Sequence, residues 1–142
     1  RLVKKSAEIL GDVLEEWVHG EIEPTAQDDS EATYCWQKDI SKENAEIDWE
    51  SMEPEYIERM VRAFIPWPIA WTEWNGKRVK LFDVDLVKFK NDRGAGDLFI
   101  DNDDLLFATK DSNTCIKVNK LQIEGKTKME AEEFVNGFRD KL

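Results

Sequence analysis

The sequence predicts a mainly β fold: a small closed or partly open barrel with flanking helices at the N-terminus, before the strands and at the C-terminus. Beyond residue 68 the spacing of apolar residues changes from a helical period to a period of two. The apolar segments there are short and are separated by polar or Gly-containing turns, as in small barrels. Two segments change phase by one residue, which indicates β-bulges. A chain of 142 residues is long enough for one domain with its own core.

The first predicted helix covers residues 2–18 and has one apolar stripe that needs a packing partner. The stripe consists of Leu2, Ile9, Leu10, Val13, Leu14 and Trp17. The segment 21–30 is acidic, contains Pro24 and is predicted to be a linker. Short alternation over residues 32–38 predicts a strand.

A second helix is predicted over residues 51–64, with Pro54 in its first turn, where proline is tolerated. Pro66 and Pro68 prevent its continuation. The apolar stripe of this helix consists of Met52, Ile57, Met60, Val61 and Phe64.

Strands are predicted over residues 79–86, 98–100, 105–108 and 116–123, and the first and last of them contain the phase changes. A final helix is predicted to begin at residues 127–130, because Thr127 and Glu130 have the spacing of a capping box. Phe134 and Phe138 are four residues apart, so both are expected to face the core.

Charge is distributed unevenly along the chain, which has a formal net charge of −11. Residues 1–50 contain 5 basic and 14 acidic side chains. Residues 77–93 contain six basic and three acidic residues, and residues 117–128 contain four Lys and one Glu. The net charge repels polyanions at long range, but a local basic face could still bind a nucleic-acid backbone with strong salt dependence.

Several classes of protein do not fit this sequence. The longest uncharged run, residues 63–72, contains two prolines, whereas a membrane span needs about 20 apolar residues. Two cysteines do not make a disulfide framework. The chain begins with Arg1 and has no signal segment. We therefore expect a piece of a longer protein in a reducing compartment, the cytoplasm.

Catalytic and metal-binding patterns do not emerge from the sequence. His19 is placed at the end of the first helix, where it favours the negative end of the helix dipole. Cys35 and Cys115 are 80 residues apart and are expected to be small buried apolar residues. The run at residues 101–104 fails the EF-hand pattern and is expected to be a loop tip. The chain is thus predicted to be a binding or positioning module.

Four landmarks occur in order along the chain. They are Ala32-Thr33-Tyr34 with Ile47-Asp48-Trp49; Arg62-Ala63-Phe64-Ile65-Pro66-Trp67-Pro68; a strand series in which Gly96 opens one strand; and Leu121-Gln122-x-x-Gly125-Lys126-x-x-Met129. This series resembles the C-terminal domain of the methionyl-tRNA formyltransferase family over about residues 27–142. Residues 1–26 then resemble the last helix of the catalytic domain and a linker.

The resemblance implies an open, OB-like Greek-key barrel that helps to hold tRNA. The family transfers a formyl group from 10-formyltetrahydrofolate to the amino group of initiator methionyl-tRNA, with catalytic Asn, His and Asp residues in an N-terminal domain. This chain would carry no cofactor and no catalytic residue, and its partners would be the tRNA and that catalytic domain, with no membrane. The candidate tRNA-binding residues are Arg62, Lys126, Lys128, Lys77, Arg78, Lys80, Lys38 and Lys42.

Each candidate has an alternative interpretation. Arg62 could pair with Asp48 or Glu58, and Lys77 and Lys80 could lie on the outer face of the barrel without a ligand. The tryptophans Trp67, Trp71 and Trp74 could stack on bases, although the Pro-Trp-Pro run favours a packing wedge.

Two other functions also remain open: the C-terminal domain of a sugar-nucleotide N-formyltransferase, and a protein-interaction or bracing module. A tRNA-binding domain requires the basic candidates to converge on one face, whereas the other two functions do not.

Overall fold

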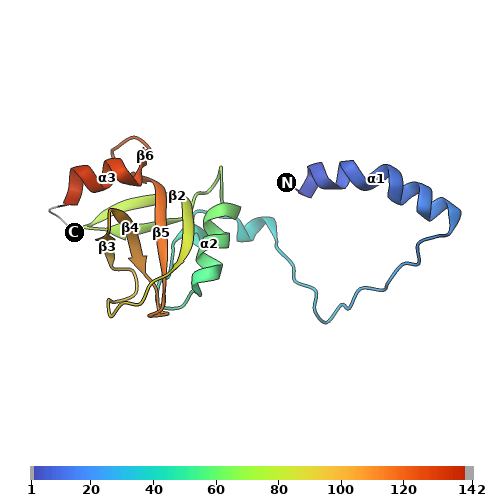
Figure 1. Cartoon of the computed structure of the whole chain (residues 1–142), viewed down its shortest axis with the longest axis horizontal. Helices are drawn as coiled ribbons and strands as arrows, with labels where there is room; N and C mark the ends of the chain where they lie inside the picture. The colour runs from blue at the N-terminus through green and yellow to red at the C-terminus, as the bar shows by residue number, and fades with distance from the viewer. Residues whose placement is uncertain (1, 140–142) are drawn as a thin grey trace. The chain divides into compact units, whose positions relative to one another are not determined.

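The computed structural model describes residues 2–139, and the chain divides into two compact units, residues 1–34 and 35–142 (Figure 1). The first unit contains one helix, α1 (Leu2–His19), followed by an irregular segment. Within the described residues, no helix is long and apolar enough to span a membrane.

Helix α1 has the predicted bounds to within one residue, and none of its described residues is buried. Ile9, Val13 and Trp17 of its apolar stripe are all exposed. His19 lies in the last turn, with its Nδ1 atom 2.8 Å from the Glu15 carbonyl oxygen. The packing partner of this stripe therefore stays a prediction.

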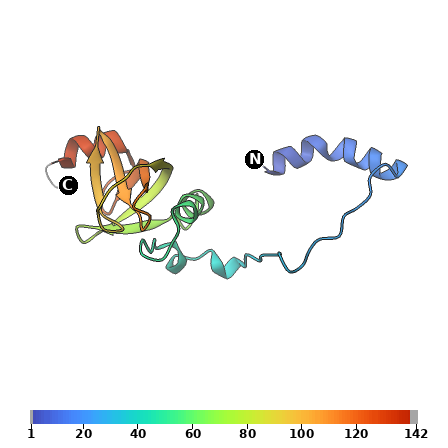
Figure 2. The same cartoon turned by 60° about the horizontal axis from the view of Figure 1, so that its bottom comes forward.

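The second unit is built on one curled antiparallel sheet, seen from two directions in Figures 1 and 2. Its strand order is β1-β2-β5-β4-β3, and β6 pairs with β5. Strands β3, β4 and β5 follow one another as hairpins, while β2 lies beside β5, which is Greek-key connectivity. The prediction of an open barrel is confirmed. The strands are β1 (Trp71–Trp74), β2 (Lys77–Lys88), β3 (Leu98–Asp101), β4 (Asp104–Ala108), β5 (Thr114–Ile123) and β6 (Met129–Glu130).

The two predicted bulges lie opposite each other in β2 and β5. Leu81 pairs with Leu121 and Asp83 with Lys120, so Phe82 is an extra residue in β2. Val84 then pairs with Val118, so Asn119 is an extra residue in β5. Each insertion moves the following residues to the other face, which explains the change in apolar phase in both segments.

The core lies between the sheet and two helices, α2 (Pro54–Ala63) and α3 (Ala131–Phe138). Pro54 occupies the first turn of α2, as predicted. On α3, Phe134 is fully buried, and Phe138 stacks on it with ring centroids 4.9 Å apart. Trp74 of β1 makes edge-to-face contacts with both rings, which ties β1 to α3.

Two predicted elements are wrong. Residues 32–38 form no strand; Tyr34 and Trp36 are exposed, and a short 3₁₀ turn follows at Gln37–Asp39. The Asp39 carboxylate accepts the Trp36 N–H at 2.7 Å, a local bond that favours a turn over an extended strand. Strand β1, which was not predicted, forms one edge of the sheet, and Glu46 makes an isolated parallel β-bridge with its residue Trp71.

The final helix starts later than predicted. Met129 and Glu130 pair with Leu121 and Lys120 as β6, and α3 begins at Ala131 without a side-chain cap. An ion pair of 2.6 Å joins Lys120 and Glu130, so the carboxylate proposed for the capping box is used across the sheet. The prediction of two buried cysteines is half wrong, because Cys115 is buried but Cys35 is exposed.

Candidate nucleic-acid interface

A tryptophan, a lysine and a glutamine lie in a row across the outer face of three neighbouring strands. Trp71 of β1 pairs with Lys80 of β2, and Lys80 pairs with Gln122 of β5. Directly opposed residues point to the same face, so these three side chains lie in line. Val79 and Leu81, on either side of Lys80, are fully buried and hold the strand against the core.

The Leu-Gln-x-x-Gly-Lys motif forms the end of β5 and the turn after it. Leu121 is buried, and Gln122 donates from Nε2 to the Lys126 carbonyl at 2.8 Å. Gly125 has φ +77°, a left-handed conformation that side chains other than glycine rarely adopt. The Lys126 N–H donates to the Ile123 carbonyl at 2.9 Å. The motif thus fixes a tight turn that exposes Lys126 to solvent.

A shallow hollow lies between this turn and β2, and we call it the basic hollow. Its wall contains the cations Arg78 and Lys80 and the amide of Gln122. One acid, Glu124, is also present, and its Oε2 accepts the Arg78 backbone N–H at 3.3 Å. The hollow is lined by Arg78, Lys80, Gln122, Ile123, Glu124 and Gly125.

Arg78 is held in place by an aromatic ring. Its guanidinium carbon lies 3.9 Å from the centroid of the Trp71 ring. The indole Nε1 of Trp71 donates to the Lys42 carbonyl at 3.4 Å, which ties the segment before α2 to the same strand. A guanidinium stacked on a ring keeps its in-plane N–H donors free for a bidentate anion such as phosphate.

Two more of the eight candidate cations, Arg62 and Lys128, lie at a second hollow, the α2–β2 groove. Arg62 lines this groove, and Lys128 places its Nζ atom 4.0 Å from the centroid of Phe82, which also lines it. Arg62 pairs with Glu58 at 3.1 Å, one helical turn away, so the first of its two predicted acidic partners, Asp48, is not used. The groove is lined by Glu58, Val61, Arg62, Ile65, Phe82, Asp83 and Val84.

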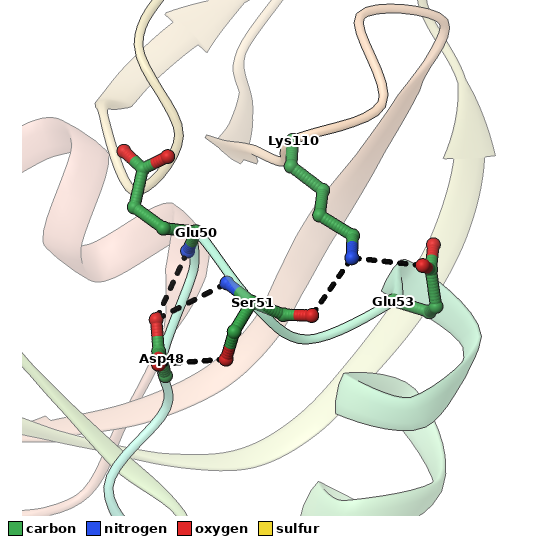
Figure 3. Close-up of polar contacts among 5 residues, drawn as sticks. All are labelled: Asp48, Glu50, Ser51, Glu53 and Lys110. Carbon is green, nitrogen blue, oxygen red and sulfur yellow. Dashed lines mark hydrogen bonds and ion pairs between the residues drawn. The ribbon is translucent and has the colours of Figure 1, made fainter.

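Asp48 instead builds the turn that precedes α2 (Figure 3). Its carboxylate accepts the Ser51 hydroxyl at 2.6 Å and the backbone N–H groups of Ser51 and Glu50 at 3.2 Å. These hydrogen bonds, with the Ser51 hydroxyl first, lower the pKa of Asp48 from its usual value of 3.8. Lys110 Nζ donates to the Ser51 carbonyl at 2.7 Å and contacts Glu53 Oε1 at 2.8 Å. Asp48 is therefore a structural residue.

The next residue of this motif, Trp49, anchors the turn in the core. Its Nε1 atom donates to the buried Thr72 hydroxyl at 2.8 Å, and its ring stacks on Phe107 with centroids 4.7 Å apart. Gly96 passes directly over the indole, where an added Cβ would lie 2.8 Å from Cδ1. The Ile-Asp-Trp landmark and the Gly96 landmark thus meet at one structural contact.

The structure groups some of the predicted cations and separates others. Arg78 and Lys80 line the basic hollow, Arg62 lines the α2–β2 groove, and Lys128 lies over Phe82 of that groove. Lys126 is exposed on the turn beside the basic hollow, where its carbonyl accepts the Gln122 amide. Lys77 pairs with Trp74 and points to the opposite face from Arg78, as alternation along β2 requires. Lys38 is exposed on the 3₁₀ turn, and Lys42 contributes its carbonyl rather than its ammonium.

The tryptophan predictions have three different outcomes. Trp71 lies under Arg78, and Trp74 packs on Phe134. Trp67 is 55% exposed while the adjacent Pro68 is buried, so the packing wedge is formed by the proline and not by the ring. Sequence reasoning missed Gln122 and Phe82 as site residues, although the motif contains the first and the bulge contains the second. Within the described residues, no group of acidic, His and Cys side chains could hold a metal ion.

A family model and the sequences of known relatives point to the same family. Residues 39–139 match the family model described as formyl transferase, C-terminal domain. The chain is 34% identical over 143 residues to a methionyl-tRNA formyltransferase of Halalkalibacterium halodurans, covering all of this chain and 44% of that protein. It is also 34% identical over 134 residues to a methionyl-tRNA formyltransferase of Pseudoalteromonas translucida, covering 92% of this chain and 40% of the relative.

Among solved structures, the fold is similar to HypX from Aquifex aeolicus. The TM-score is 0.60 at 19% sequence identity, with 95% of this chain and 23% of HypX covered. A HypX complex with tetrahydrofolic acid gives a TM-score of 0.59 at 20% identity, covering 92% of this chain and 22% of that one. At these identities the likeness concerns the fold alone. The chain spans less than half the length of its relatives, and it belongs to the formyl transferase C-terminal domain family.

Proposed function

We propose that this chain is the tRNA-holding C-terminal part of a methionyl-tRNA formyltransferase that acts in the cytoplasm. The observation that carries the proposal is the basic hollow on the outer face of the sheet, whose wall contains Arg78 and Lys80; the exposed Lys126 follows its last lining residue, Gly125, in the chain. The names of the relatives support tRNA as the ligand. The ligand chemistry that fits the hollow is the phosphate backbone of initiator methionyl-tRNA.

The proposed role of these cations is positional. Phosphate contacts fix the register and orientation of a nucleic acid without reading its sequence. Arg78 is held by Trp71, so it loses little side-chain freedom when it binds a phosphate. Formyl transfer from 10-formyltetrahydrofolate is proposed to occur in the portion of the enzyme that this chain does not span, and holding the acceptor arm would bring its amino group to the donor.

The acidity of the chain sets the expected strength of binding. The net charge of −11 opposes RNA at long range, and Glu124 lies within the hollow itself. If three phosphates are contacted, affinity should fall roughly 20- to 40-fold between 50 and 200 mM salt. Weak binding at low salt that decreases at this rate is therefore the expected behaviour.

Fluorescence anisotropy with labelled initiator tRNA tests the proposal on this chain. Lys80→Ala should weaken binding severalfold and should reduce the slope of log affinity against log salt by about one. Lys90→Ala is the matched control, because Lys90 is an exposed lysine beyond the other end of β2. The proposal fails if the two substitutions have equal effects, or if no tRNA binds at low salt.

One observation favours a bracing module as the second candidate. Helix α1 exposes its apolar stripe along its whole length, and such a surface is suited to a protein neighbour. A sugar-nucleotide formyltransferase would also use its C-terminal domain in this way, without a basic face. Absence of tRNA binding, together with unchanged stability of Lys80→Ala, would favour this second class.

A further inference from the structure

We propose that the α2–β2 groove is a subsite for one unpaired nucleobase of the RNA, with the phosphate of that nucleotide bound by Arg62 and Lys128. This inference rests on the proposed function and extends it from phosphate contacts to contact with a base. It commits to RNA as the occupant, and a protein partner or a second copy of the chain is an outcome that the test can detect.

The floor of the groove is apolar and partly exposed, through Ile65 and Phe82. Val61, Ile65, Phe82 and Val84 line it, and Ile65 is 42% exposed. Phe82 is the extra residue of the β2 bulge, so its side chain is freed from the alternation that buries Leu81 and Val84. An accessible aromatic ring among aliphatic side chains is suited to stacking with the flat face of a base.

The rim of the groove has the charges that a nucleotide requires. Lys128 Nζ lies over the Phe82 ring, 4.0 Å from its centroid, so a base that stacks on this face has to displace the ammonium, which then stays within reach of the phosphate of the same nucleotide. Arg62 uses one N–H group for Glu58, and its guanidinium has five donors, so further donors are left for a phosphate. The side chain of Arg62 is 69% exposed, which leaves it free to approach a ligand.

The two acids of the groove narrow the class of ligand. Glu58 is neutralised by Arg62, whereas Asp83 is an exposed carboxylate on the groove wall. A carboxylate accepts hydrogen bonds from the amino and ring N–H groups of a base, but it repels a ligand that is only anionic. A flat ring with N–H donors and one phosphate matches this combination. Bases inside a duplex are stacked on their neighbours, so the occupant has to be unpaired.

Guanosine 5′-monophosphate is a suitable probe, and ribose 5-phosphate is the control that has the phosphate but no base. In a titration followed by amide resonances of the ¹⁵N-labelled chain, the nucleotide should shift residues 61–65 and 82–84. Ribose 5-phosphate, which has no base, should not shift residues 82–84. Initiator tRNA should displace the nucleotide. Shifts confined to the basic hollow, or no displacement by tRNA, would overturn the proposal.

Phe82→Ala should weaken the affinity for the nucleotide at least about fivefold, since that is the smaller end of the effect of losing one stacking ring. Phe82→Leu retains an apolar side chain without the ring and should also weaken it, which separates stacking from packing. Tyr56→Ala is the control, because Tyr56 is an exposed aromatic residue of α2 outside the groove. Equal affinities in all variants would refute a stacking site.

The two proposals fail in different ways. Lys80→Ala with intact tRNA tests the basic hollow, and Phe82→Ala with the mononucleotide tests the groove. If tRNA binding depends on Lys80 but the nucleotide does not bind the groove, the proposed function stands and this inference is wrong. If apolar contact with protein occupies the groove, the chain should self-associate or bind no nucleotide, which also contradicts the inference.

Discussion

Gly96 is the position where one added methyl group should have the largest structural effect. It has φ +86°, and a Cβ atom built on it lies 2.8 Å from Cδ1 and 3.0 Å from Cγ of Trp49. Trp49 cannot move away easily, because its ring stacks on buried Phe107 and its Nε1 atom donates to Thr72. Gly96→Ala should therefore destabilise the second unit.

The expected magnitude has two parts. A residue with a Cβ in the left-handed region costs roughly 1–2 kcal/mol relative to glycine. Forcing an extra methyl group into a packed core costs roughly 1–3 kcal/mol. Gly96→Ala should thus lower the free energy of unfolding by roughly 2–5 kcal/mol, a large share of the stability of a typical domain.

Gly125→Ala separates the two parts. Gly125 has φ +77°, but nothing lies within 4 Å of the Cβ position. Its substitution should therefore cost only the backbone part, roughly 1–2 kcal/mol. Urea unfolding followed by near-ultraviolet circular dichroism measures both variants through the packed aromatic side chains. If Gly96→Ala and Gly125→Ala have the same midpoint, the contact with Trp49 has no energetic effect and the reasoning is refuted.

Two further predictions concern pH and the first unit. The hydrogen bonds of Asp48 lower its pKa, so the carboxylate stabilises the fold above pH 3.8 and this contribution is lost as the pH falls through the lowered value. Thermal melting should show Asp48→Asn less stable than the wild type near neutral pH, with the difference shrinking in acid; a constant difference would contradict this. Removing residues 1–34 deletes nine acidic and three basic residues. The shortened chain should bind tRNA more tightly at low salt, because fewer carboxylates oppose the RNA, and an unchanged or weaker affinity in fluorescence anisotropy would contradict this.

The strands were largely predictable because the buried positions of a strand alternate with exposed ones, and this alternation is visible as apolar and polar residues in the sequence. The phase changes at Leu81 and Val84 of β2 and at Val118 and Leu121 of β5 correctly indicated two bulges. A bulge shifts the alternation of apolar residues by one position, and this shift is visible in the sequence of one strand without knowledge of its pairing partner.

The errors arose where hydrogen-bond partners decide the structure. The segment around Tyr34 and Trp36 alternates, but Asp39 captures the Trp36 N–H and makes a turn. The Thr127–Glu130 spacing fits a cap, but Glu130 pairs with Lys120 across the sheet. In the first case a local hydrogen bond decides against the strand, and in the second an ion pair to a neighbouring strand decides against the cap.

The sequence predicted which cations are candidates for the site, but not which of them lie close together or on the same face of the sheet. That Lys80 lies beside Gln122, while Lys77 points to the other face, depends on the pairing register of β2 and β5. This register is set by paired bulges and cannot be obtained from charge spacing along the chain. The choice of Glu58 over Asp48 as the partner of Arg62 likewise depends on Asp48 being occupied by Ser51.

Most of the landmark residues support the scaffold, and this limits what family membership says about ligands. Trp49, Gly96 and Leu121 are core contacts, and Gly125 shapes a turn. The fold is similar in HypX at 19% identity, so it tolerates the exchange of most residues. We therefore expect ligand binding to depend on exposed residues, which can differ between proteins without disturbing the fold. At physiological salt, charges more than about 8 Å apart are largely screened. A phosphate in the basic hollow would therefore respond to Arg78 and Lys80 more than to the net charge of −11.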